Sequence, residues 1–306
     1  MTNNKLFPSA ATTDYSLPHL FTFTPPAFTT FDNCIIAFGI VFTVLGGFGN
    51  ALHLPFVTRS GGLLSYSKFA QNVQCGISLS SRVGMFFLYF PAFLLSLLIV
   101  TDESVFSQPR VWVVSLCTCL HFGKRSFEVL FVHVYSGTMP LLSSITIGSY
   151  YCLLAYVNIH YAAHSATVHD APLQTEVNQQ AGFDLHAESV IDGMFVGLSL
   201  FCVGSLGNFY HHWLLSTLRL PGDTSYKVPM GGLFSNLGGV AAPHYLFELV
   251  AWVGVSILTK HWVSVLFTFG MVCYLVDRAM AQNEWNRKNL KDKYPASRKN
   301  IVPYLF

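Results

Sequence analysis

Long apolar segments alternate with short polar ones along the chain, and this pattern predicts a series of helices. A helix of about 20 mainly apolar residues crosses a hydrocarbon core about 30 Å thick. Seven segments approach or exceed that length, at residues 33–57, 83–101, 111–134, 141–163, 189–218, 244–259 and 261–282. We therefore expect an all-α, polytopic membrane protein that forms a bundle of about seven transmembrane helices. Residues 1–32 would be a lumenal N-terminal tail, and residues 33–306 a single membrane-embedded domain.

The composition supports a membrane protein. Hydrophobic residues make up 52% of the chain and charged residues only 10%, whereas soluble domains carry about 25% charged residues. The seven cysteines form no C-x-x-C pair, so we expect neither a zinc site nor another metal site. We expect the lipid bilayer, and not nucleic acid, as a partner.

The basic residues predict the orientation of the bundle. Lys and Arg in short loops are retained on the cytoplasmic side of a membrane. With a lumenal N-terminus and seven spans, eleven of the 17 basic residues fall in the cytosolic loops and tail. Only Lys5, Arg110 and Lys260 fall on the opposite side. The C-terminus is therefore expected in the cytosol.

Charged residues interrupt the third apolar segment. His121, Lys124, Arg125 and Glu128 lie within about 100° of arc on a helix, and Lys124 can pair with Glu128 at i, i+4. A charge at bilayer depth costs roughly 2.5 to 3.5 kcal/mol on insertion scales, so such residues usually face a cavity and bind something. A structural ion pair in the bundle interior is the alternative.

Polar stripes also follow the later segments. On the fifth, Asn208, His212 and Arg219 fall within about 40° of arc. They present an amide, an imidazole and a guanidinium along one face. The alternative interpretation of Arg219, and of Lys227 in the following loop, is that they are ordinary loop charges of the positive-inside rule.

The sixth segment carries a stripe of its own. Tyr245, Glu248 and Trp252 share a face, and His244 lies one turn from Glu248. Packing aromatics are the alternative for Tyr245 and Trp252. Arg278 stands near the end of the seventh segment. Cationic and amide groups from four segments can converge on one polyanionic ligand, and a nucleotide diphosphate is the natural candidate.

The dinucleotide fingerprint is absent from the chain. Gly46, Gly47 and Gly49 do not fit G-x-G-x-x-G, and they lie in an apolar segment with no strand before them. A nucleotide would therefore be held by side chains between helices, with arginine supplying bidentate phosphate contacts.

These residues make up blocks that resemble the C-terminal half of the steroid 5-alpha-reductase family, over about residues 141–306. The blocks are Asn208 with Arg219, Tyr226-Lys227-Val228-Pro229 with Gly231-Gly232-Leu233-Phe234, His244-Tyr245-x-x-Glu248-x-x-x-Trp252, Arg278, and Tyr294-Pro295-x-x-Arg298 with Pro303-Tyr304-Leu305-Phe306.

The third segment resembles a different branch of the same superfamily, the very-long-chain trans-2-enoyl-CoA reductases of the endoplasmic reticulum. The matching stretch is His121-x-x-Lys124-Arg125-x-x-Glu128-x-Leu130-Phe131-Val132-His133-x-x-Ser136-x-Thr138-Met139-Pro140.

The resemblance implies a seven-helix reductase of the endoplasmic reticulum membrane. Such an enzyme takes a hydride from NADPH and reduces a carbon-carbon double bond conjugated to a carbonyl in a lipid. The third-segment motif favours a long-chain trans-2-enoyl-CoA, the substrate of the last step of fatty acid elongation, with other elongation enzymes as partners. A 3-oxo-4-ene steroid is the alternative substrate.

The resemblance also implies roles for single residues. Positions that line or support the NADPH pocket in the steroid branch match Asn208, Arg219, Tyr226, Lys227, His244, Glu248 and Arg278. We add His212, which stands where that branch has an acidic residue. Lys124 and Arg125 match a basic pair of the enoyl-CoA branch, and Tyr245 matches its proposed catalytic tyrosine.

Some positions depart from the steroid branch. That branch polarises its ketone with a Glu and a Tyr, and the aligned positions here are Tyr89 and Phe122. Asn286 replaces a tyrosine near the cofactor. We expect Tyr89, Phe122, Glu128 and Trp252 to line the substrate, and these departures weigh against steroid reduction.

The chemistry supports one further expectation. Hydride addition to the β carbon leaves an enolate whose α carbon needs a proton. A tyrosine phenol beside a cation suits that transfer. We expect Tyr245 to be the proton donor, with Lys124 or Arg125 beside it.

Other protein classes fit the sequence less well. A di-iron desaturase needs about eight histidines in three boxes, and the chain has no H-x-x-H-H box. An isoprenylcysteine-type membrane methyltransferase has a similar C-terminal half but binds S-adenosylmethionine. A lipid-binding protein without catalysis is the remaining alternative.

Overall fold

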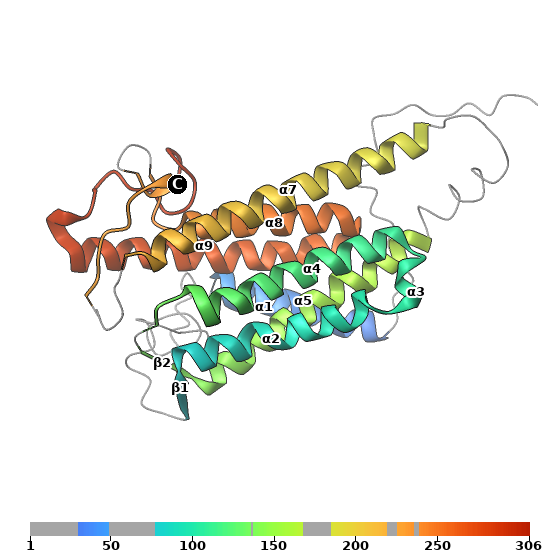
Figure 1. Ribbon diagram of the computed structural model, residues 1–306, viewed down its shortest axis with the longest axis horizontal. Coiled ribbons are helices and arrows are strands. Elements are labelled where there is room, and N and C mark those ends of the chain that lie inside the picture. The colour runs from blue at the N-terminus through green and yellow to red at the C-terminus, as the bar shows by residue number, and fades with distance from the viewer. Residues whose placement is uncertain (1–29, 49–76, 136, 168–184, 219–224, 236–238) are drawn as a thin grey trace, which may run out of the picture.

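Seven long helices lie roughly parallel to one another along the longest axis of the molecule (Figure 1). The computed structural model describes residues 30–48, 77–135, 137–167, 185–218, 225–235 and 239–306. Within them the long helices are α1 (Thr30–Phe48), α2 (Ser81–Val100), α4 (Pro109–Phe127), α5 (Leu141–Ser165), α7 (Leu185–Ser216), α8 (Pro243–Thr259) and α9 (Trp262–Leu290). Each corresponds to one of the seven apolar segments, so the helical fold is confirmed.

Four of these helices are long and apolar enough to cross a membrane. They include all of α2 and α5, residues 193–216 of α7, and α9. Helices α1 and α8 are apolar but shorter. Helix α4 carries three cations, Arg110, Lys124 and Arg125, within its 19 residues, which lowers its hydropathy. The count of seven membrane crossings therefore stays a prediction.

A small antiparallel ribbon departs from the expected all-α fold. Strands β1 (Ser78–Ser80) and β2 (Thr138–Pro140) pair with Leu79 opposite Met139. Each strand runs directly into a helix, β1 into α2 and β2 into α5. The ribbon thereby fixes the first turns of α2 and α5 beside each other.

Short helical turns complete the chain and bear on the site. Helix α3 (Glu103–Phe106) joins α2 to α4. The 3-10 turn η4 (Gly232–Phe234) precedes α8, and the 3-10 turn η5 (Lys291–Lys293) follows α9. Helix α4 continues as a π-helix, η2 (Glu128–Val132). Such π turns frequently occur at functional sites.

Helix α4 lies between α2 and α8, and α7 packs closely along α8. Glycines allow the close approach of α7 and α8, because a Cβ at Gly204 would lie 2.3 Å from the backbone nitrogen of Ala251. This packing brings the polar stripes of α4, α7 and α8 to one end of the bundle.

The C-terminal segment packs over the same end of the molecule (Figure 1). Arg298 is buried, and its Nη2 donates hydrogen bonds of 2.6 Å to the carbonyl oxygens of Pro229 and Phe234. A parallel bridge between Val240 and Lys299 adds a backbone connection. Arg298 thereby fixes the loop that carries Tyr226 and Lys227.

Several sequence predictions lie outside the described residues. They are Arg219, most of the tail at 1–32, and the cytosolic loop charges Arg59 and Lys68.

Candidate active site

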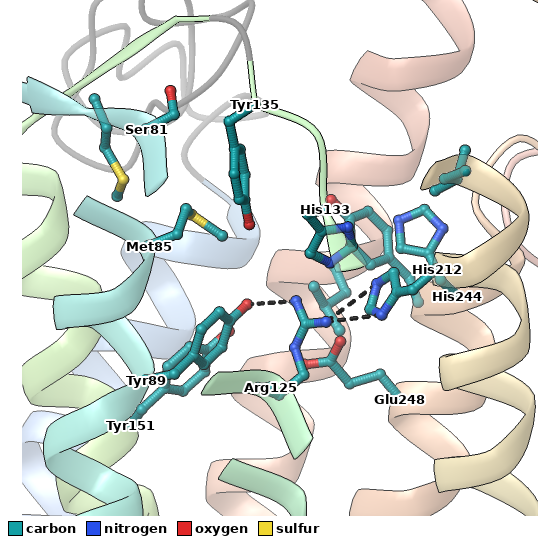
Figure 2. Close-up of a pocket in the computed structure, with 14 residues that line it drawn as sticks. Ser81, Met85, Tyr89, Arg125, His133, Tyr135, Tyr151, His212, His244 and Glu248 are labelled. Atoms are coloured by element: carbon teal, nitrogen blue, oxygen red, sulfur yellow. Dashed lines mark hydrogen bonds between the residues drawn. The ribbon is translucent and has the colours of Figure 1, made fainter. Parts of the chain in front are cut away.

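A cavity of about 170 Å³ lies between α2, α4, α7 and α8 (Figure 2). Helix α2 contributes Ser81, Met85 and Tyr89, which are spaced four residues apart and therefore share one helix face. The other helices and the segment after η2 supply mainly polar and aromatic groups. The remaining lining residues are Arg125, His133, Tyr135, Met139, Tyr151, His212, Leu215, His244, Tyr245, Glu248 and Leu275.

Arg125 lies at the centre of the polar wall of this cavity. Its Nη2 donates a hydrogen bond of 2.7 Å to the hydroxyl of Tyr89. Its Nη1 lies 2.7 Å from Nδ1 of His212 and also bonds to Glu128. The guanidinium thus connects α2 with α7 and stays 5% exposed.

Glu128, the first residue of η2, is the counter-ion of this wall. Its side chain is fully buried and accepts from Lys124 at 3.1 Å and from Arg125. Nδ1 of His212 lies 3.0 Å from its Oε2. Arginine only donates hydrogen bonds and a carboxylate only accepts them. Nδ1 of His212 therefore accepts from Arg125 in one tautomer and donates to Glu128 in the other.

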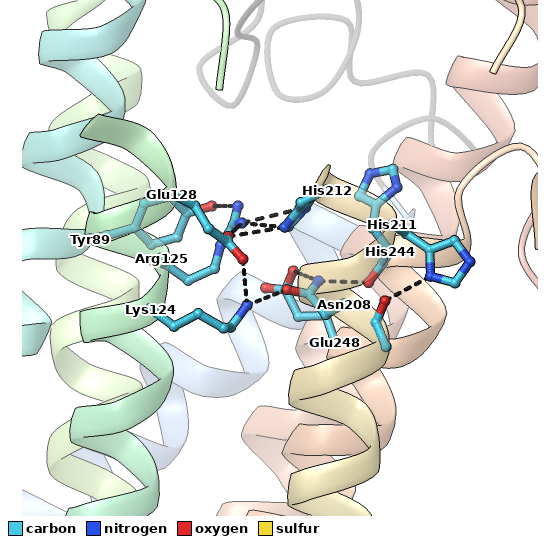
Figure 3. A network of polar contacts seen from close by, with 10 residues as sticks. Tyr89, Lys124, Arg125, Glu128, Asn208, His211, His212, His244 and Glu248 are labelled. Carbon is cyan, nitrogen blue, oxygen red and sulfur yellow. Dashed lines mark hydrogen bonds and ion pairs between the residues drawn. The ribbon is translucent and has the colours of Figure 1, made fainter. Parts of the chain in front are cut away.

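Lys124 and Asn208 form the adjoining part of the network (Figure 3). Nζ of Lys124 donates to Oδ1 of Asn208. Nδ2 of Asn208 donates to the backbone oxygen of His244 at 2.8 Å and lies 3.5 Å from Oε2 of Glu248. Lys124 and Asn208 therefore connect helices, and neither is among the residues that line the cavity.

Aromatic rings form a packed layer, the aromatic floor, next to Tyr89 and Tyr151 of the cavity wall. Tyr151 stacks on Tyr89 with a centroid distance of 5.4 Å, and Phe122 lies 5.6 Å from both Tyr151 and Trp252. His121 packs 4.7 Å from Trp252 and so belongs to this aromatic floor. Phe122 and Trp252 are at most 1% exposed, and neither is among the lining residues.

A second, larger cavity of about 290 Å³ adjoins the first. The two cavities share His133, Tyr135, Leu215 and His244. The other lining residues of the second cavity are Val134, Ser216, Leu218, Tyr226, Lys227, Pro229, Ala241, Gln282, Asn286 and Leu290.

Polar groups are spread around the second cavity. Lys227 supplies a cation, and Nε2 of Gln282 donates to Oδ1 of Asn286 at 2.8 Å. The ring of Tyr226 packs 4.5 Å from that of Trp285. At the junction with the first cavity, the buried Nδ1 of His244 has no hydrogen-bond partner among the described residues.

These features fit an elongated polar ligand such as a dinucleotide. A buried imidazole nitrogen without a partner is costly, and a bound ligand that offers a hydrogen bond would remove that cost. Lys227 suits a phosphate, and the ring of Tyr226 suits a flat base.

Glu128, His133 and His212 place ligand atoms within 4.8 Å of one another, as in a metal site. However, Nη1 of Arg125 bonds to both Glu128 and His212. A guanidinium between two of the three ligands repels a cation, so this cluster favours a salt-bridged network.

The structure brings together most of the described residues that the sequence singled out. Tyr89, Arg125, His212, His244, Tyr245 and Glu248 line the first cavity, and Tyr226, Lys227 and His244 line the second. Lys124, Glu128 and Asn208 contact one another or Arg125 without lining either cavity. Phe122 and Trp252 pack in the aromatic floor and also do not line a cavity. Arg278 is buried on α9, between Leu275 of the first cavity and Gln282 of the second, and is not itself among the lining residues. The roles assigned to all of these residues stay predictions.

Some lining residues were missed from the sequence. His133 could have been recognised, because it is a histidine in an apolar segment next to the charged cluster. Tyr151 and Met85 carried no such signal, because an aromatic or methionine side chain in an apolar helix usually belongs to the core.

Comparisons with known proteins support the resemblance expected from the sequence. Residues 138–306 match the family described as 3-oxo-5-alpha-steroid 4-dehydrogenase. The very-long-chain enoyl-CoA reductase of Dictyostelium discoideum is 32% identical over 214 residues, which cover 70% of this chain and 63% of that protein. The chain thus spans less than two thirds of that relative.

Two further relatives carry a steroid name. The 3-oxo-5-alpha-steroid 4-dehydrogenase 1 of Homo sapiens is 31% identical over 65% of this chain and 71% of its own length. The 3-oxo-5-alpha-steroid 4-dehydrogenase 2 of Sus scrofa is 27% identical over 84% of this chain and 92% of its own length. All three names denote oxidoreductases.

Proposed function

Because the chain belongs to the 3-oxo-5-alpha-steroid 4-dehydrogenase family, we propose that it reduces a carbon-carbon double bond conjugated to a carbonyl, with NADPH as reductant. The preferred substrate is a long-chain trans-2-enoyl-CoA. A 3-oxo-4-ene steroid is the second candidate, because relatives with that name align over up to 92% of their length. The distant methyltransferase alternative has no support from these relatives.

The observation that carries this proposal is the pair of cavities that meet at His133 and His244. The larger cavity has the cation of Lys227 and the aromatic ring of Tyr226, which suit a nucleotide. The smaller one has Arg125, Tyr89 and Tyr245 on its walls. A cofactor that spans the junction would bring its reactive end to the substrate.

The residues of this chain then have separate tasks. Tyr226, Lys227 and His244 hold the cofactor, and Arg219, Asn208, His212, Glu248 and Arg278 complete or support that site. When bound, NADPH supplies a hydride to the carbon β to the carbonyl. Tyr245 gives the proton of its hydroxyl to the α carbon and regains one from water.

Three observations favour an enoyl thioester as substrate. Phe122 offers no hydroxyl and is fully buried among rings. Coenzyme A carries phosphates, which the cations on the proposed cytosolic side would bind. A steroid has no phosphate and therefore needs no such cations. The relative from Dictyostelium discoideum bears the corresponding name.

We further propose that the protein crosses the endoplasmic reticulum membrane about seven times, with its C-terminus in the cytosol. The charge distribution of the loops supports this orientation. In that position the enzyme would act with other fatty acid elongation enzymes. Residues 33–306 would form its single reductase domain.

NADPH oxidation by the purified full-length protein tests the proposal. The assay compares a long-chain trans-2-enoyl-CoA with a 3-oxo-4-ene steroid under the same conditions. Turnover of the enoyl-CoA is expected, and turnover of the steroid alone would reassign the substrate. Binding of NADPH without turnover of either compound would favour a lipid-binding protein.

A further inference from the structure

His211 on α7 contacts both α8 and the turn η4 through its ring. The side chain is 3% exposed and lies on the side of α7 away from Arg125 (Figure 3). Its ring stacks on that of Phe247 in α8 at a centroid distance of 5.1 Å. The ring of Phe234 in η4 meets it edge-on at 5.7 Å. The imidazole is therefore held between a helix and the end of the loop at residues 225–235.

Both nitrogens of this ring have backbone partners. Nδ1 lies 2.7 Å from the carbonyl oxygen of Gly207, one turn earlier on α7. Nε2 lies 3.1 Å from the backbone nitrogen of Leu233. A carbonyl oxygen only accepts and an amide N–H only donates, so Nδ1 carries the proton and Nε2 accepts. The two partners thus select one neutral tautomer of His211, which holds the N–H of Leu233.

Two glycines allow the backbone to approach the ring. Gly231 and Gly232 have φ angles of +89° and +49°, which glycine adopts readily. A Cβ at Gly232 would lie only 2.7 Å from Nε2 of His211. This turn therefore presents the N–H of Leu233 to the imidazole without a side chain between them.

The loop that His211 holds forms part of the second cavity, because Tyr226 and Lys227 line that cavity. Leu215 lines it from α7, one turn beyond His211 and therefore on the same helix face. Leu233 follows Lys227 by only six residues. Fixing the amide of Leu233 to α7 therefore limits where Tyr226 and Lys227 can lie.

We propose that His211 is a positioning residue for the cofactor, because its Nε2 holds the amide of Leu233 and thereby places Tyr226 and Lys227 at the second cavity. This inference rests on the proposed function, which puts NADPH in that cavity. A loop that is already ordered loses less conformational entropy when the cofactor binds, so the bond raises affinity. His211 acts on cofactor binding and takes no part in hydride or proton transfer.

Arg298 limits the size of the expected effect. Its Nη2 donates to the carbonyl oxygens of Pro229 and Phe234 and so supports the same loop from the C-terminal segment. Loss of the bond from Leu233 to His211 therefore loosens the loop without detaching it. Loss of one hydrogen bond corresponds to a roughly tenfold change in affinity.

Two substitutions separate the bond to Leu233 from the rest of the imidazole. In His211→Gln the side-chain carbonyl reaches the position of Nε2 and can accept from Leu233. In His211→Asn the side-chain amide reaches only the position of Nδ1, so it keeps the bond to Gly207 and loses the loop. His160→Asn is the control, because His160 lies on α5 at an exposed position.

NADPH affinity is measured by titration of the full-length protein in detergent, and hydrogen exchange of residues 225–235 is measured without NADPH. His211→Asn should weaken NADPH binding roughly tenfold and speed hydrogen exchange in the loop. Its kcat at saturating NADPH should stay close to that of the wild type. His211→Gln should restore both affinity and protection, and His160→Asn should match the wild type.

Wild-type affinity and loop exchange in His211→Asn would overturn the inference and leave the proposed function standing. Equal weakening in His211→Asn and His211→Gln would also overturn it, because an acceptor at the position of Nε2 would then have no effect. Absence of NADPH binding by the wild type would overturn the proposed function together with the inference.

A spectroscopic measurement on the wild type decides the matter if His211→Asn does not fold. The ¹⁵N spectrum of protein labelled at histidine distinguishes the two neutral tautomers, and the signal that disappears in His211→Gln belongs to His211. A proton on Nδ1 is expected. A proton on Nε2 would exclude the bond from Leu233 and refute the role of His211.

Discussion

Lys124 and Asn208 are 84 residues apart in the sequence, and a hydrogen bond from Nζ of Lys124 to Oδ1 of Asn208 joins them. The bond connects α4 to α7. Because Nδ2 of Asn208 also donates to the backbone oxygen of His244, the same amide connects α7 to the first turn of α8. The side chain of Asn208 thus connects three helices beside the cavity by hydrogen bonds.

Substitution Asn208→Ala is expected to destabilise the ligand-free protein. It leaves Nζ of Lys124 and the carbonyl oxygen of His244 with one partner fewer each, at a cost of about 1–3 kcal/mol. Thermal unfolding in detergent measures the effect. Asn289→Ala on α9 is the control, because Asn289 is exposed and, within the described part of the chain, its side chain bonds to the backbone oxygen of Trp285 in its own helix. An unchanged melting temperature with weaker NADPH binding would instead make Asn208 a ligand contact.

Substitution Glu128→Gln is expected to be more damaging. It leaves Lys124 and Arg125 without the carboxylate that both of them contact. Breaking a buried ion pair on one side costs about 3–5 kcal/mol. Denaturant or thermal unfolding should show the loss, whereas Glu284→Gln at an exposed position of α9 should change stability little. Equal stability of the two variants would argue against a structural role for Glu128.

Substitution Tyr245→Phe is expected to lower kcat by about 10²–10⁴-fold, the usual contribution of a positioned general acid. Binding of substrate should change little, since the ring stays in place against His244. Single-turnover NADPH oxidation and a separate binding titration distinguish these effects. Full turnover in a normally expressed variant would remove Tyr245 from the proton-transfer step.

Substitution His244→Ala is expected to weaken NADPH binding. Its buried Nδ1 lies at the junction of the cavities and has no hydrogen-bond partner among the described residues. Loss of a hydrogen bond to the cofactor would reduce affinity roughly tenfold or more. A titration of tryptophan fluorescence with NADPH provides the measurement. His160→Ala, towards the other end of α5, should bind NADPH like the wild type.

Substitution Gly232→Ala is expected to disturb the loop that carries Tyr226 and Lys227. The φ angle of Gly232 is +49°, and an added Cβ would lie 2.7 Å from Nε2 of His211. That nitrogen accepts a hydrogen bond from the backbone of Leu233. A left-handed conformation costs a non-glycine residue about 1–2 kcal/mol, in addition to the clash.

Limited proteolysis of the loop and NADPH affinity check this prediction. Gly137→Ala is the matched control, because the nearest atom to its added Cβ among the described residues is Oγ of Ser81, at 3.7 Å. Gly232→Ala should increase cleavage and weaken binding, and Gly137→Ala should do neither. Identical behaviour of the two variants would show that the loop tolerates the strain.

The helices and their polar faces were predictable because they depend on neighbours in the sequence. The pairing of Lys124 with Glu128 follows from i, i+4 spacing, and the structure has it at 3.1 Å. Apolar periodicity likewise located all seven long helices. The ribbon of β1 and β2 was missed, since three-residue strands give too short a pattern to recognise.

Contacts between helices were not predictable in the same way. Tyr89 and Arg125 are separated by 36 residues, and their hydrogen bond depends on how α2 packs against α4. Phe122, expected to line the substrate, lies one layer deeper because Tyr151 from α5 covers it. Such details follow from side-chain packing across the bundle, which no single segment encodes.

The shared walls of the two cavities have a thermodynamic consequence. A ligand in either cavity contacts His133, Tyr135, Leu215 or His244, and so orders side chains that the other ligand also meets. Cofactor and substrate should therefore bind cooperatively. By linkage, each must change the affinity of the other by the same factor.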